Sequence, residues 1–333
     1  MRIVVTGGAG FIGSNFVRHL LREHPADEVV VLDKLTYAGN LENLRDVRDD
    51  PRFTFVRGDI CDPEVVDRVT AGTDAIVNFA AETHVDRSIS GPDDFITTDV
   101  LGTHVLLHAV RAHRVGRYVQ ISTDEVYGDI AEGSSVEGDP LRPSSPYSAS
   151  KAAGDLMVLA YRRTYGTPVL ITRSSNNYGP YQYPEKIVPL FVTNLLDGQP
   201  VPVYGDGRNV RDWIYVDDNC RAIDLVLREG AEGEVYNIGG GAEVANVDLT
   251  RALLAALGLG DEMIRWVSDR AGHDRRYSVD SSRLRSLGWE PLVSYDEGLE
   301  RTISWYRANR AWWETIKSGD WKRYYARQYR ELS

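Results

Sequence analysis

Residues 2–21 read RIVVTGGAGFIGSNFVRHLL, and this stretch decides the fold. The β-branched run RIVVT predicts a buried strand, and the apolar spacing from Phe11 onward predicts a helix. The turn between them holds four glycines, Gly7, Gly8, Gly10 and Gly13. Glycines in this position let backbone N–H groups approach a pyrophosphate at the positive end of the helix. The stretch therefore predicts a dinucleotide-binding turn.

The alternation of strand and helix continues through the first half of the chain. Apolar runs recur as EVVVLD, FTFVRGD, DAIVNFA, RYVQIS and PVLITR, and helical patterns such as GTHVLLHAVRAHR separate most of them. This rhythm predicts an α/β fold with a doubly wound, Rossmann-type parallel sheet, covered by helices on both faces. In such open sheets, ligands bind in the crevice at the carboxyl ends of the strands.

Carboxylates and small residues stand at these strand ends. Asp33 ends the second strand, where it would accept hydrogen bonds from a ribose diol and repel a 2′-phosphate, which predicts NAD rather than NADP. Asp59 and Ile60 end the third strand, where an adenine would lie. Ala80 and Ala81 end the fourth strand, where small side chains permit close approach. We therefore expect NAD to bind across these strand ends.

The rhythm changes near residue 175, where SSNNYGPYQYPEK begins a stretch of turns, short strands and helices. We predict an NAD-binding Rossmann domain over residues 1–175 and a smaller mixed α/β substrate domain over residues 176–333, with some later segments returning to the sheet. The stretch from Trp305 onward holds four of the seven tryptophans, and we expect it to pack on the body or at a subunit interface.

Composition narrows the range of partners. The chain has 333 residues and a formal net charge of -11, which argues against broad binding to nucleic acid or to anionic membranes. No run approaches the roughly 18 apolar residues of a membrane span. Cys61 and Cys220 lack metal-site or CxxC spacing, so we expect them to be reduced. We expect a cytoplasmic protein with a small-molecule substrate and no nucleic-acid or membrane partner.

Tyr147 and Lys151 stand four residues apart at the start of a predicted helix, so they share one face. An unperturbed tyrosine has a pKa near ~10, and a neighbouring ammonium and a cationic nicotinamide both favour the tyrosinate form. We therefore expect the pKa of Tyr147 to be lowered, so that Tyr147 takes a proton from a substrate alcohol as its hydride leaves. Thr123, two residues past the fifth strand, could hydrogen-bond the same oxygen.

Two adjacent carboxylates, Asp124 and Glu125, follow the strand RYVQIS. A solvated loop tip is the ordinary explanation for such a pair, but this strand end faces the predicted crevice. Mutual repulsion and burial tend to keep one of two adjacent carboxyl groups protonated. The pair can therefore supply a general acid and a general base to the same substrate.

These features together resemble a known superfamily. The glycine-rich turn, the acidic strand end, Thr123 and the Tyr-x-x-x-Lys pair are similar to those of the extended short-chain dehydrogenases/reductases that act on nucleotide sugars. Within that superfamily, the chain resembles the dTDP-glucose 4,6-dehydratase family essentially from end to end. The resemblance rests on the runs STDEVYG, HVDRSI, SPYSASKA, SNNYGPYQYPEKIVP, YGDGRNVRDWIYVDD and DRAGHDRRY.

The resemblance implies an NAD-dependent hydro-lyase that works as a homodimer. Its reaction oxidises the sugar at carbon 4, eliminates water across carbons 5 and 6 and returns the hydride to carbon 6, which gives dTDP-4-keto-6-deoxy-glucose. By similarity, Asp124 is the acid that protonates the departing oxygen and Glu125 is the base that removes the carbon-5 proton. Thr123, Tyr147 and Lys151 would serve the oxidation. Only the resemblance selects thymidine among the possible bases.

The resemblance also implies two sets of binding residues. Those expected at the cofactor are Gly7, Gly10, Phe11, Ile12, Gly13, Asp33, Lys34, Thr36, Asp59, Ile60, Ala80, Ala81, Thr98, Tyr147, Lys151 and Asn177. Those expected at the nucleotide sugar are Thr83, Thr123, Asn176, Lys186, Ile187, Pro202, Tyr204, Arg211, Asn246, Asp269, Arg270 and His273. Arg211 also has a direct physical interpretation, because a guanidinium fork suits a diphosphate on an otherwise acidic protein.

The chain departs from the family pattern at two positions. Asp99 stands where the superfamily usually carries Asn, which leaves the local hydrogen-bond pattern open, and Ala271 stands where Pro is usual. His104 and His108 lie four residues apart on a predicted helix, but no supporting acidic ligand accompanies them, so we predict no metal site.

Two other functions are weighed against the dehydratase. A 4-epimerase or decarboxylase of the same superfamily would need the cofactor site, Tyr147 and Lys151, but not the Asp124-Glu125 pair. A non-catalytic NAD-binding protein would be expected to lack Thr123, Tyr147 or Lys151, and all three are present.

Overall fold

Seven strands rich in apolar residues form one parallel sheet in the computed structural model, which describes residues 1–269, 272–318 and 320–330. The strand order is β10-β6-β5-β4-β1-β2-β3, with every neighbouring pair parallel. The strands are β1 (Arg2–Thr6), β2 (Glu28–Asp33), β3 (Phe53–Arg57), β4 (Ala75–Asn78), β5 (Arg117–Thr123), β6 (Val169–Ser174) and β10 (Val235–Ile238). Strands that are buried on both faces need continuous apolar runs, and such runs in the sequence predict the positions of these strands. The predicted doubly wound sheet is confirmed.

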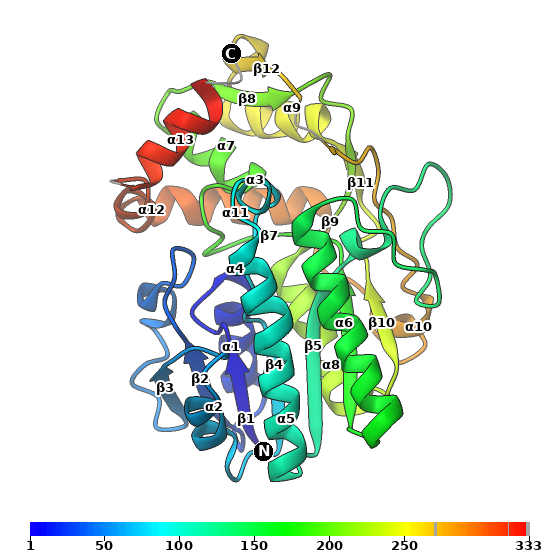
Figure 1. Ribbon diagram of the computed structural model, residues 1–333. Helices are drawn as coiled ribbons and strands as arrows, with labels where there is room; N and C mark the ends of the chain where they lie inside the picture. Colours follow the sequence, from blue (N-terminus) through cyan, green and yellow to red (C-terminus); the bar gives the residue numbers. More distant parts are fainter. Residues whose placement is uncertain (270–271, 319, 331–333) are drawn as a thin grey trace.

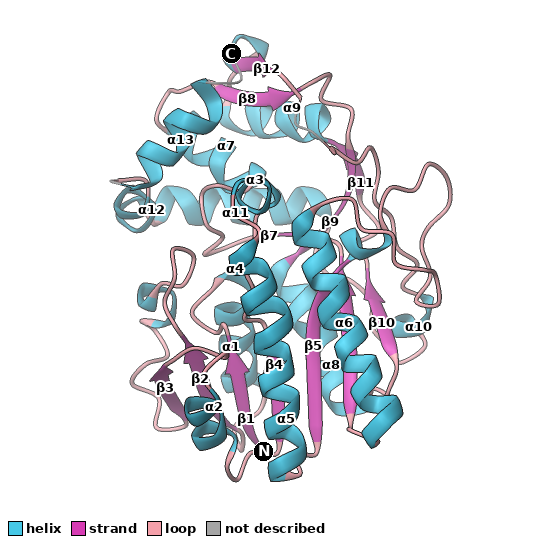
Figure 2. Cartoon of the chain, viewed as in Figure 1, coloured by secondary structure: helices cyan, strands magenta, loops and turns pink. Residues whose placement is uncertain are grey.

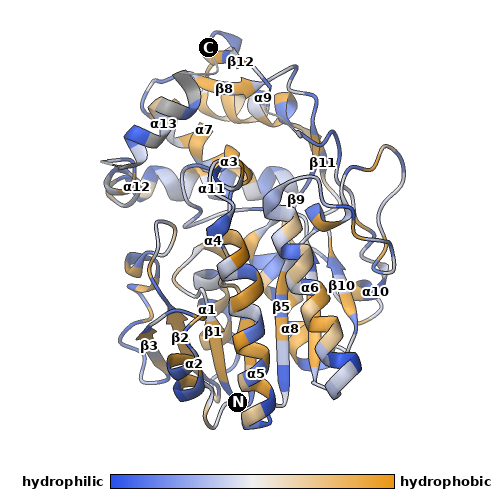
Figure 3. Ribbon diagram, in the orientation of Figure 1, coloured by the Kyte–Doolittle hydropathy of each residue, from blue (hydrophilic) through white to orange (hydrophobic). Residues whose placement is uncertain are grey.

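Helices cover both faces of this sheet (Figure 1). One apolar core lies between the sheet and α1 (Phe11–Glu23), α8 (Val216–Glu229) and α10 (Ser282–Arg285). A second core lies on the opposite face, under α2 (Pro63–Thr70), α5 (Thr103–His113) and α6 (Pro146–Tyr165). The shorter connecting helices are η1 (Leu41–Leu44), α3 (Val85–Ser90), α4 (Asp93–Phe95), the π-helix η2 (Ile96–Gly102) and η3 (Asp124–Tyr127). Figure 3 colours β1, β2 and much of α5 as hydrophobic, as burial on two faces requires.

A smaller part of the chain lies over the carboxyl ends of the large sheet (Figure 2). It contains a three-stranded sheet in the order β11-β9-β7 and the two-stranded pair β12-β8. Its strands are β7 (Asn176–Tyr178), β8 (Val201–Tyr204), β9 (Val210–Tyr215), β11 (Glu243–Ala245) and β12 (Ile264–Val267). Its helices are α7 (Ile187–Leu196), α9 (Asn246–Leu257), η4 (Asp261–Met263), α11 (Tyr295–Ala308), α12 (Arg310–Ile316) and α13 (Asp320–Arg330).

The aromatic tail packs into the core of this smaller part. Trp313 is 1% exposed and Trp321 is 6% exposed, and both belong to the same apolar cluster as Phe191 and Leu253. Packing of the tail on the body, which the sequence predicts, is therefore confirmed. Two elements that follow residue 175, α8 and β10, belong to the large sheet and its covering layer. None of the helices in the described ranges is long and apolar enough to cross a membrane.

The glycine turn after β1 is required by close contacts. Gly7 has a φ of +67°, and a Cβ atom on it would lie 2.6 Å from the backbone nitrogen of Ala80, just past β4. A Cβ atom on Gly13 would collide with the carbonyl oxygen of Gly7, one turn back. These contacts draw the start of α1 against the ends of β1 and β4, where the strand order reverses. This is the point at which doubly wound sheets bind their ligands.

A buried polar network ties together β5, β6 and β10 beneath the same edge. Arg173 donates from Nε to Oδ2 of Asp155 at 2.9 Å and from NH1 to the hydroxyl of Tyr127 at 2.8 Å. The Tyr127 hydroxyl in turn donates to Asn237 at 2.8 Å, and Ser122 donates to Asp155 at 3.0 Å. The side chains of Arg173 and Asp155 are 2% and 0% exposed, so each charge depends on the other.

We predict that Arg173→Met lowers the free energy of unfolding by about 3–5 kcal/mol, because removing one partner leaves the Asp155 carboxylate buried and unpaired. Denaturant unfolding of the purified variant measures this. The matched control is Arg162→Met, which breaks the half-exposed pair with Glu232 and should cost about 0–1 kcal/mol. Equal losses in the two variants would contradict the role given to the buried pair.

Candidate active site

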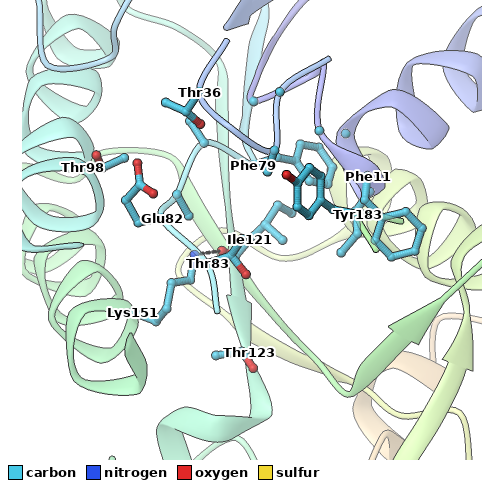
Figure 4. Close-up of a pocket in the computed structure, with 18 of the residues that line it drawn as sticks. Phe11, Thr36, Phe79, Glu82, Thr83, Thr98, Ile121, Thr123, Lys151 and Tyr183 are labelled. Carbon is cyan, nitrogen blue, oxygen red and sulfur yellow. Dashed lines mark hydrogen bonds between the residues drawn. The ribbon is translucent and has the colours of Figure 1, made fainter. Parts of the chain in front are cut away.

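A large cavity opens at the carboxyl ends of β1, β2, β4, β5 and β6, beneath the smaller part of the chain (Figure 4). Its walls come from the glycine turn, the strand ends, the start of α6 and the loop after β7. In Figure 4, Phe11 and Tyr183 lie on one side of this space and Thr98, Glu82 and Lys151 on the other.

Every residue predicted to bind the cofactor lines this one cavity. They are Gly7, Gly10, Phe11, Ile12, Gly13, Asp33, Lys34, Thr36, Asp59, Ile60, Ala80, Ala81, Thr98, Tyr147, Lys151 and Asn177. Their individual roles stay predictions, but the fold brings them to one place from six separate segments of the first half and from β7, which holds Asn177.

The turn around Asp33 fits a dinucleotide. Oδ2 of Asp33 accepts a hydrogen bond from the N–H of Ala9 at 3.0 Å, and Oδ1 accepts one from Leu35 at 2.8 Å, so the carboxylate clamps the glycine turn to the end of β2. Burial raises the pKa of Asp33, and these two amide hydrogen bonds oppose that rise. Gly10 is the N-cap of α1, and within the described residues no side chain caps this helix. Uncapped N–H groups at a helix start provide an anion site, which a pyrophosphate would fill.

Tyr147 and Lys151 are held by the first turns of α6. Ser145 and Ser148 form a capping box there, and Pro146 occupies the first helical position. Nζ of the buried Lys151 donates to the carbonyl oxygen of Ile121 at 2.6 Å, which fixes the ammonium against β5 (Figure 4). The helix start therefore carries the pair to the same strand end as Thr123.

The pKa of Tyr147 differs from the sequence expectation. Burial and the negative charges of Glu125, Asp99 and Asp124 raise it well above the ordinary value for tyrosine, and a hydrogen bond with Thr123 opposes them. The expectation of a lowered pKa is therefore wrong for the protein without its ligands, because it counted the ammonium and omitted three nearby carboxyl groups. Tyr147 carries its proton at neutral pH in this state.

Asp124 is buried and Glu125 is half-buried, so the pair is not the tip of a solvated loop. Thr123 ends β5 and caps η3, where its Oγ1 donates to Oδ1 of Asp124 at 3.1 Å. Asp124 is 2% exposed, and its Oδ2 atom has no hydrogen-bond partner among the described residues. Burial first, and then the charge of Glu125, raise the pKa of Asp124 to about 8. This raised pKa favours the protonated form of Asp124 at neutral pH.

The residues predicted to bind the nucleotide sugar fall into two groups. Thr83, Thr123, Asn176 and Lys186 line the cavity. The others belong to the smaller part and do not line it: Ile187, Pro202, Tyr204, Arg211, Asn246, Asp269 and His273. Arg270 lies outside the described residues, as does Ala271.

Within the second group, Arg211 lies near the carboxyl pair, and we call Arg211 together with its neighbour Tyr277 the wall. Arg211 is buried on β9, stacks on the ring of Tyr277 at 4.3 Å and donates to the carbonyl oxygen of Asp274 at 2.9 Å. The positive charge of Arg211 lowers the pKa of Asp124, and the negative charge of Glu125 raises that of Tyr277. The wall and the pair are therefore within electrostatic range of each other.

Three other residues of the second group contact one another. Nδ1 of His273 donates to Oδ1 of Asp269 at 2.6 Å, and the His273 ring lies 6.0 Å from that of Tyr204, centroid to centroid. Pro202 lies apart from them and lines a second, smaller cavity with Lys317 and Trp321.

The cavity also contains residues that sequence reasoning did not select. They include Phe79, Glu82, Ser122, Gln182, Tyr183 and Glu185. Their position near strand ends could have indicated that Phe79, Glu82 and Ser122 line the cavity. No local sequence pattern indicates this for Glu185, which forms an ion pair with Arg87 at 2.9 Å.

Asp99, the position at which the chain departs from its superfamily, is buried under the same site. Its Oδ1 accepts from the N–H of Glu82 at 3.0 Å, and its Oδ2 lies 2.6 Å from the hydroxyl of Ser150. The carboxyl group therefore links the loop after β4 to α6, the helix that carries Tyr147 and Lys151.

Comparison with known proteins agrees with this geometry. Residues 4–302 match the protein family described as GDP-mannose 4,6 dehydratase. The chain therefore belongs to this family of extended short-chain dehydrogenases/reductases, as the sequence motifs predict.

The similar proteins within the family are more specific. The chain is 58% identical to a dTDP-glucose 4,6-dehydratase of Streptomyces niveus, over 96% of this chain and 97% of that protein. It is also 58% identical to a dTDP-glucose 4,6-dehydratase of Streptomyces antibioticus, over 95% and 96% of the two chains. Its fold matches the crystal structure of DesIV, a dTDP-glucose 4,6-dehydratase of Streptomyces venezuelae solved with NAD and dTDP bound, with a TM-score of 0.94 and 58% identity, over 95% of this chain and 100% of that one.

We predict that Gly13→Ala weakens NAD binding about ten- to hundredfold, because overpacking costs about 1–3 kcal/mol and the new methyl group would push the Gly7 carbonyl out of the turn. Titration of cofactor-stripped protein with NAD measures the change. Gly138→Ala is the control, since a Cβ atom there meets nothing within 4 Å. Unchanged NAD affinity in Gly13→Ala would show that the turn does not hold the cofactor.

Proposed function

We propose that the protein is a dTDP-glucose 4,6-dehydratase, an NAD-dependent hydro-lyase that converts dTDP-glucose into dTDP-4-keto-6-deoxy-glucose. The observation that carries the proposal is the Asp124-Glu125 pair, with Asp124 buried and its pKa raised, in the cavity that also holds Thr123, Tyr147 and Lys151. The similarity to dTDP-glucose 4,6-dehydratases over nearly the whole chain supports the same substrate.

The first chemical task is to prepare the sugar for elimination. NAD, when bound against the glycine turn and Asp33, would supply an acceptor for the hydride from carbon 4 and later a donor of the same hydride. Thr123 and Tyr147 are placed to hydrogen-bond the hydroxyl at carbon 4, and Tyr147 accepts its proton. Because burial and three carboxyl groups raise the pKa of Tyr147, this step depends on positive charge from Lys151 and from the occupied cofactor site.

The second task is the elimination itself, and here the carboxyl pair acts. A ketone at carbon 4 acidifies the proton at carbon 5, which Glu125 removes as the C5–H bond breaks. The electron pair forms the C5–C6 double bond, the C6–O bond breaks, and Asp124 delivers its proton to the departing oxygen, so that water leaves. The unpartnered Oδ2 atom of Asp124 is the atom free to carry that proton. An acid is needed because hydroxide is a poor leaving group.

The wall of the smaller part would hold the nucleotide diphosphate. The guanidinium of Arg211 is a fork of donors on a chain with a net charge of -11, and such forks suit phosphate oxygens. Arg211 now donates to backbone carbonyls, so binding a diphosphate requires it to exchange those partners or use its remaining N–H groups.

The alternatives are less well supported. A 4-epimerase has no elimination step and gains nothing from a protonated Asp124 beside Glu125. A non-catalytic NAD-binding protein would have no reason to retain a buried carboxyl group beside a second one, since burying it costs stability.

We also propose that the protein is a cytoplasmic homodimer. Of the ten large apolar side chains that are exposed in the described structure, five lie on adjoining elements: Ile89 on α3, Ile96 and Leu101 on η2, and Leu156 and Tyr165 on α6. A second copy of the chain would cover this face, and exposed apolar patches of this kind usually mark contacts between proteins.

The proposed reaction predicts a specific isotope pattern. Incubated in heavy water, dTDP-glucose should lose one water and gain one deuterium at carbon 5, with no net formation of NADH, as mass spectrometry and NMR would show. The UDP and GDP glucoses, run in parallel, test the base preference. A product of unchanged mass would instead indicate epimerisation, and no turnover of any of the three would favour a binding protein.

Glu125→Gln should separate the oxidation at carbon 4 from the elimination of water. The amide keeps the shape of the side chain but is not a base, so oxidation at carbon 4 should survive while elimination slows about 10²–10⁴-fold. Single-turnover measurement of cofactor reduction and of product formation distinguishes the steps. Dehydration at the parent rate would contradict the role of Glu125.

The raised pKa of Asp124 predicts the direction of the pH dependence. Below a pKa of about 8 the acid carries the proton that it must donate, and above it that proton is lost. The rate constant for elimination should therefore fall as pH rises through about 8, and Asp124→Asn should be slow across the whole range. Elimination that stays fast well above this pH would mean that another group is the acid.

A further inference from the structure

We propose that His19, His24 and Asp224 form a divalent-metal site, best suited to zinc, that fastens helix α1 to helix α8. This site is independent of the proposed reaction, since none of the three residues lines the active-site cavity. It also departs from the sequence expectation of no metal site. That expectation considered only neighbouring histidines on one helix, whereas Asp224 is about 200 residues away from the two histidines in sequence.

The three residues meet where α1 ends. His19 belongs to the penultimate turn of α1, His24 is its C-cap, and Asp224 projects from α8, which packs beside α1 on the same face of the sheet. Since α1 has 13 residues, the cluster lies about 20 Å from the glycine turn. The carboxyl end of a helix has a partial negative charge, which favours a cation there.

The ligand atoms converge on one point. Nε2 of His19 lies 3.1 Å from Oδ2 of Asp224, and Nε2 of His24 lies 2.7 Å from the same oxygen. All three atoms lie within 4.8 Å of one another. Ligands at about 2.0–2.2 Å from a tetrahedral zinc are about 3.4 Å apart, so the contacts of Asp224 with His19 and His24 would lengthen by about 0.3 and about 0.7 Å to admit the ion.

The surroundings already orient the carboxylate. Arg228 donates from Nε to Oδ1 of Asp224 at 2.8 Å, which leaves Oδ2 directed at the two imidazoles. Such outer hydrogen bonds commonly fix metal-binding carboxylates and histidines. The charge of Arg228 is shared with Asp27, to which its NH2 donates at 2.6 Å, so it opposes a bound cation less than an isolated guanidinium would. Glu23 adds negative charge close to both histidines.

The donor set and its exposure select the kind of metal. Two imidazoles and one carboxylate suit zinc, cobalt or nickel, whereas magnesium and calcium prefer oxygen ligands. The side chain of His24 is 26% exposed, against 8% for His19 and 12% for Asp224, so an ion has access and water can complete the coordination. The ion would act as a structural clamp between the helix that starts at the cofactor turn and the helix beside it.

The test uses the full chain without an affinity tag, treated with a chelator and then titrated with zinc chloride in a calorimeter. We expect one zinc per chain and a rise in the thermal unfolding midpoint with zinc concentration. Cobalt(II) in place of zinc should give the visible absorption of a four-coordinate site. Failure of the parent protein to bind either metal specifically would overturn the proposal.

Two variants make the test specific. His24→Gln should weaken zinc binding at least about 100-fold, since the loss of even an outer-shell group costs about 10–100-fold. His113→Gln is the matched control, because His113 makes an equally short 2.7 Å contact with Asp67 but has no second histidine beside that carboxylate. Equal zinc affinity in His24→Gln and the parent would sink the assignment, as would equal losses in both variants. Unfolding midpoints and circular dichroism, measured without metal, show whether each variant is folded. The variant His19→Gln removes the more buried of the two histidine ligands and should also weaken zinc binding.

Discussion

The burial of Asp124 beside a second, half-buried carboxyl group at the end of β5 is the constraint on which the active site depends. Water would stabilise both as carboxylates, but here Asp124 is enclosed, and the charge of Glu125 beside it makes a second negative charge still more costly. The pair therefore settles with one proton, which gives an acid and a base without any metal or further residue. The same negative charge raises the pKa of Tyr147, so the acid–base pair and the tyrosine cannot be tuned independently.

The polar network below the site explains how such a costly arrangement is tolerated. Tyr127, three residues after Asp124, is anchored to Arg173 and Asn237, and Arg173 is neutralised by Asp155. These contacts fix the short η3 turn from below, so that the strand end has little freedom to move its carboxyl groups out into water. Lys151, bonded to the Ile121 carbonyl, fixes the same strand from the side of α6. The site is rigid because the two flanking elements are each tied to β5.

Much of the fold and of the candidate site could be predicted from the sequence, because these features depend on patterns of a few neighbouring residues. The large sheet and the cofactor residues at strand ends, such as Asp33, Asp59 and Ala80, follow from runs and turns of a few residues, because all strand ends lie at the same crevice. Others, such as Phe11, Thr98 and Asn177, were expected only from the family resemblance. Pairings across long separations could not be predicted in this way, and they include Arg173 with Asp155, Glu185 with Arg87, and the wall around Arg211. The pKa of Tyr147 was mispredicted for the same reason, since Asp99 and Glu125 approach it only in the folded chain.

The path of the chain between its two parts has a consequence for how such enzymes can diversify. Strand β10 and helix α8 come from the second half of the sequence, yet one forms the edge of the large sheet and the other covers its face. A cut near residue 175 would therefore remove a structural wall of the nucleotide fold together with the sugar pocket. We therefore expect that the smaller part cannot be exchanged as a separate domain by gene fusion. New substrate specificities would instead arise by substitutions and loop insertions within one continuous chain.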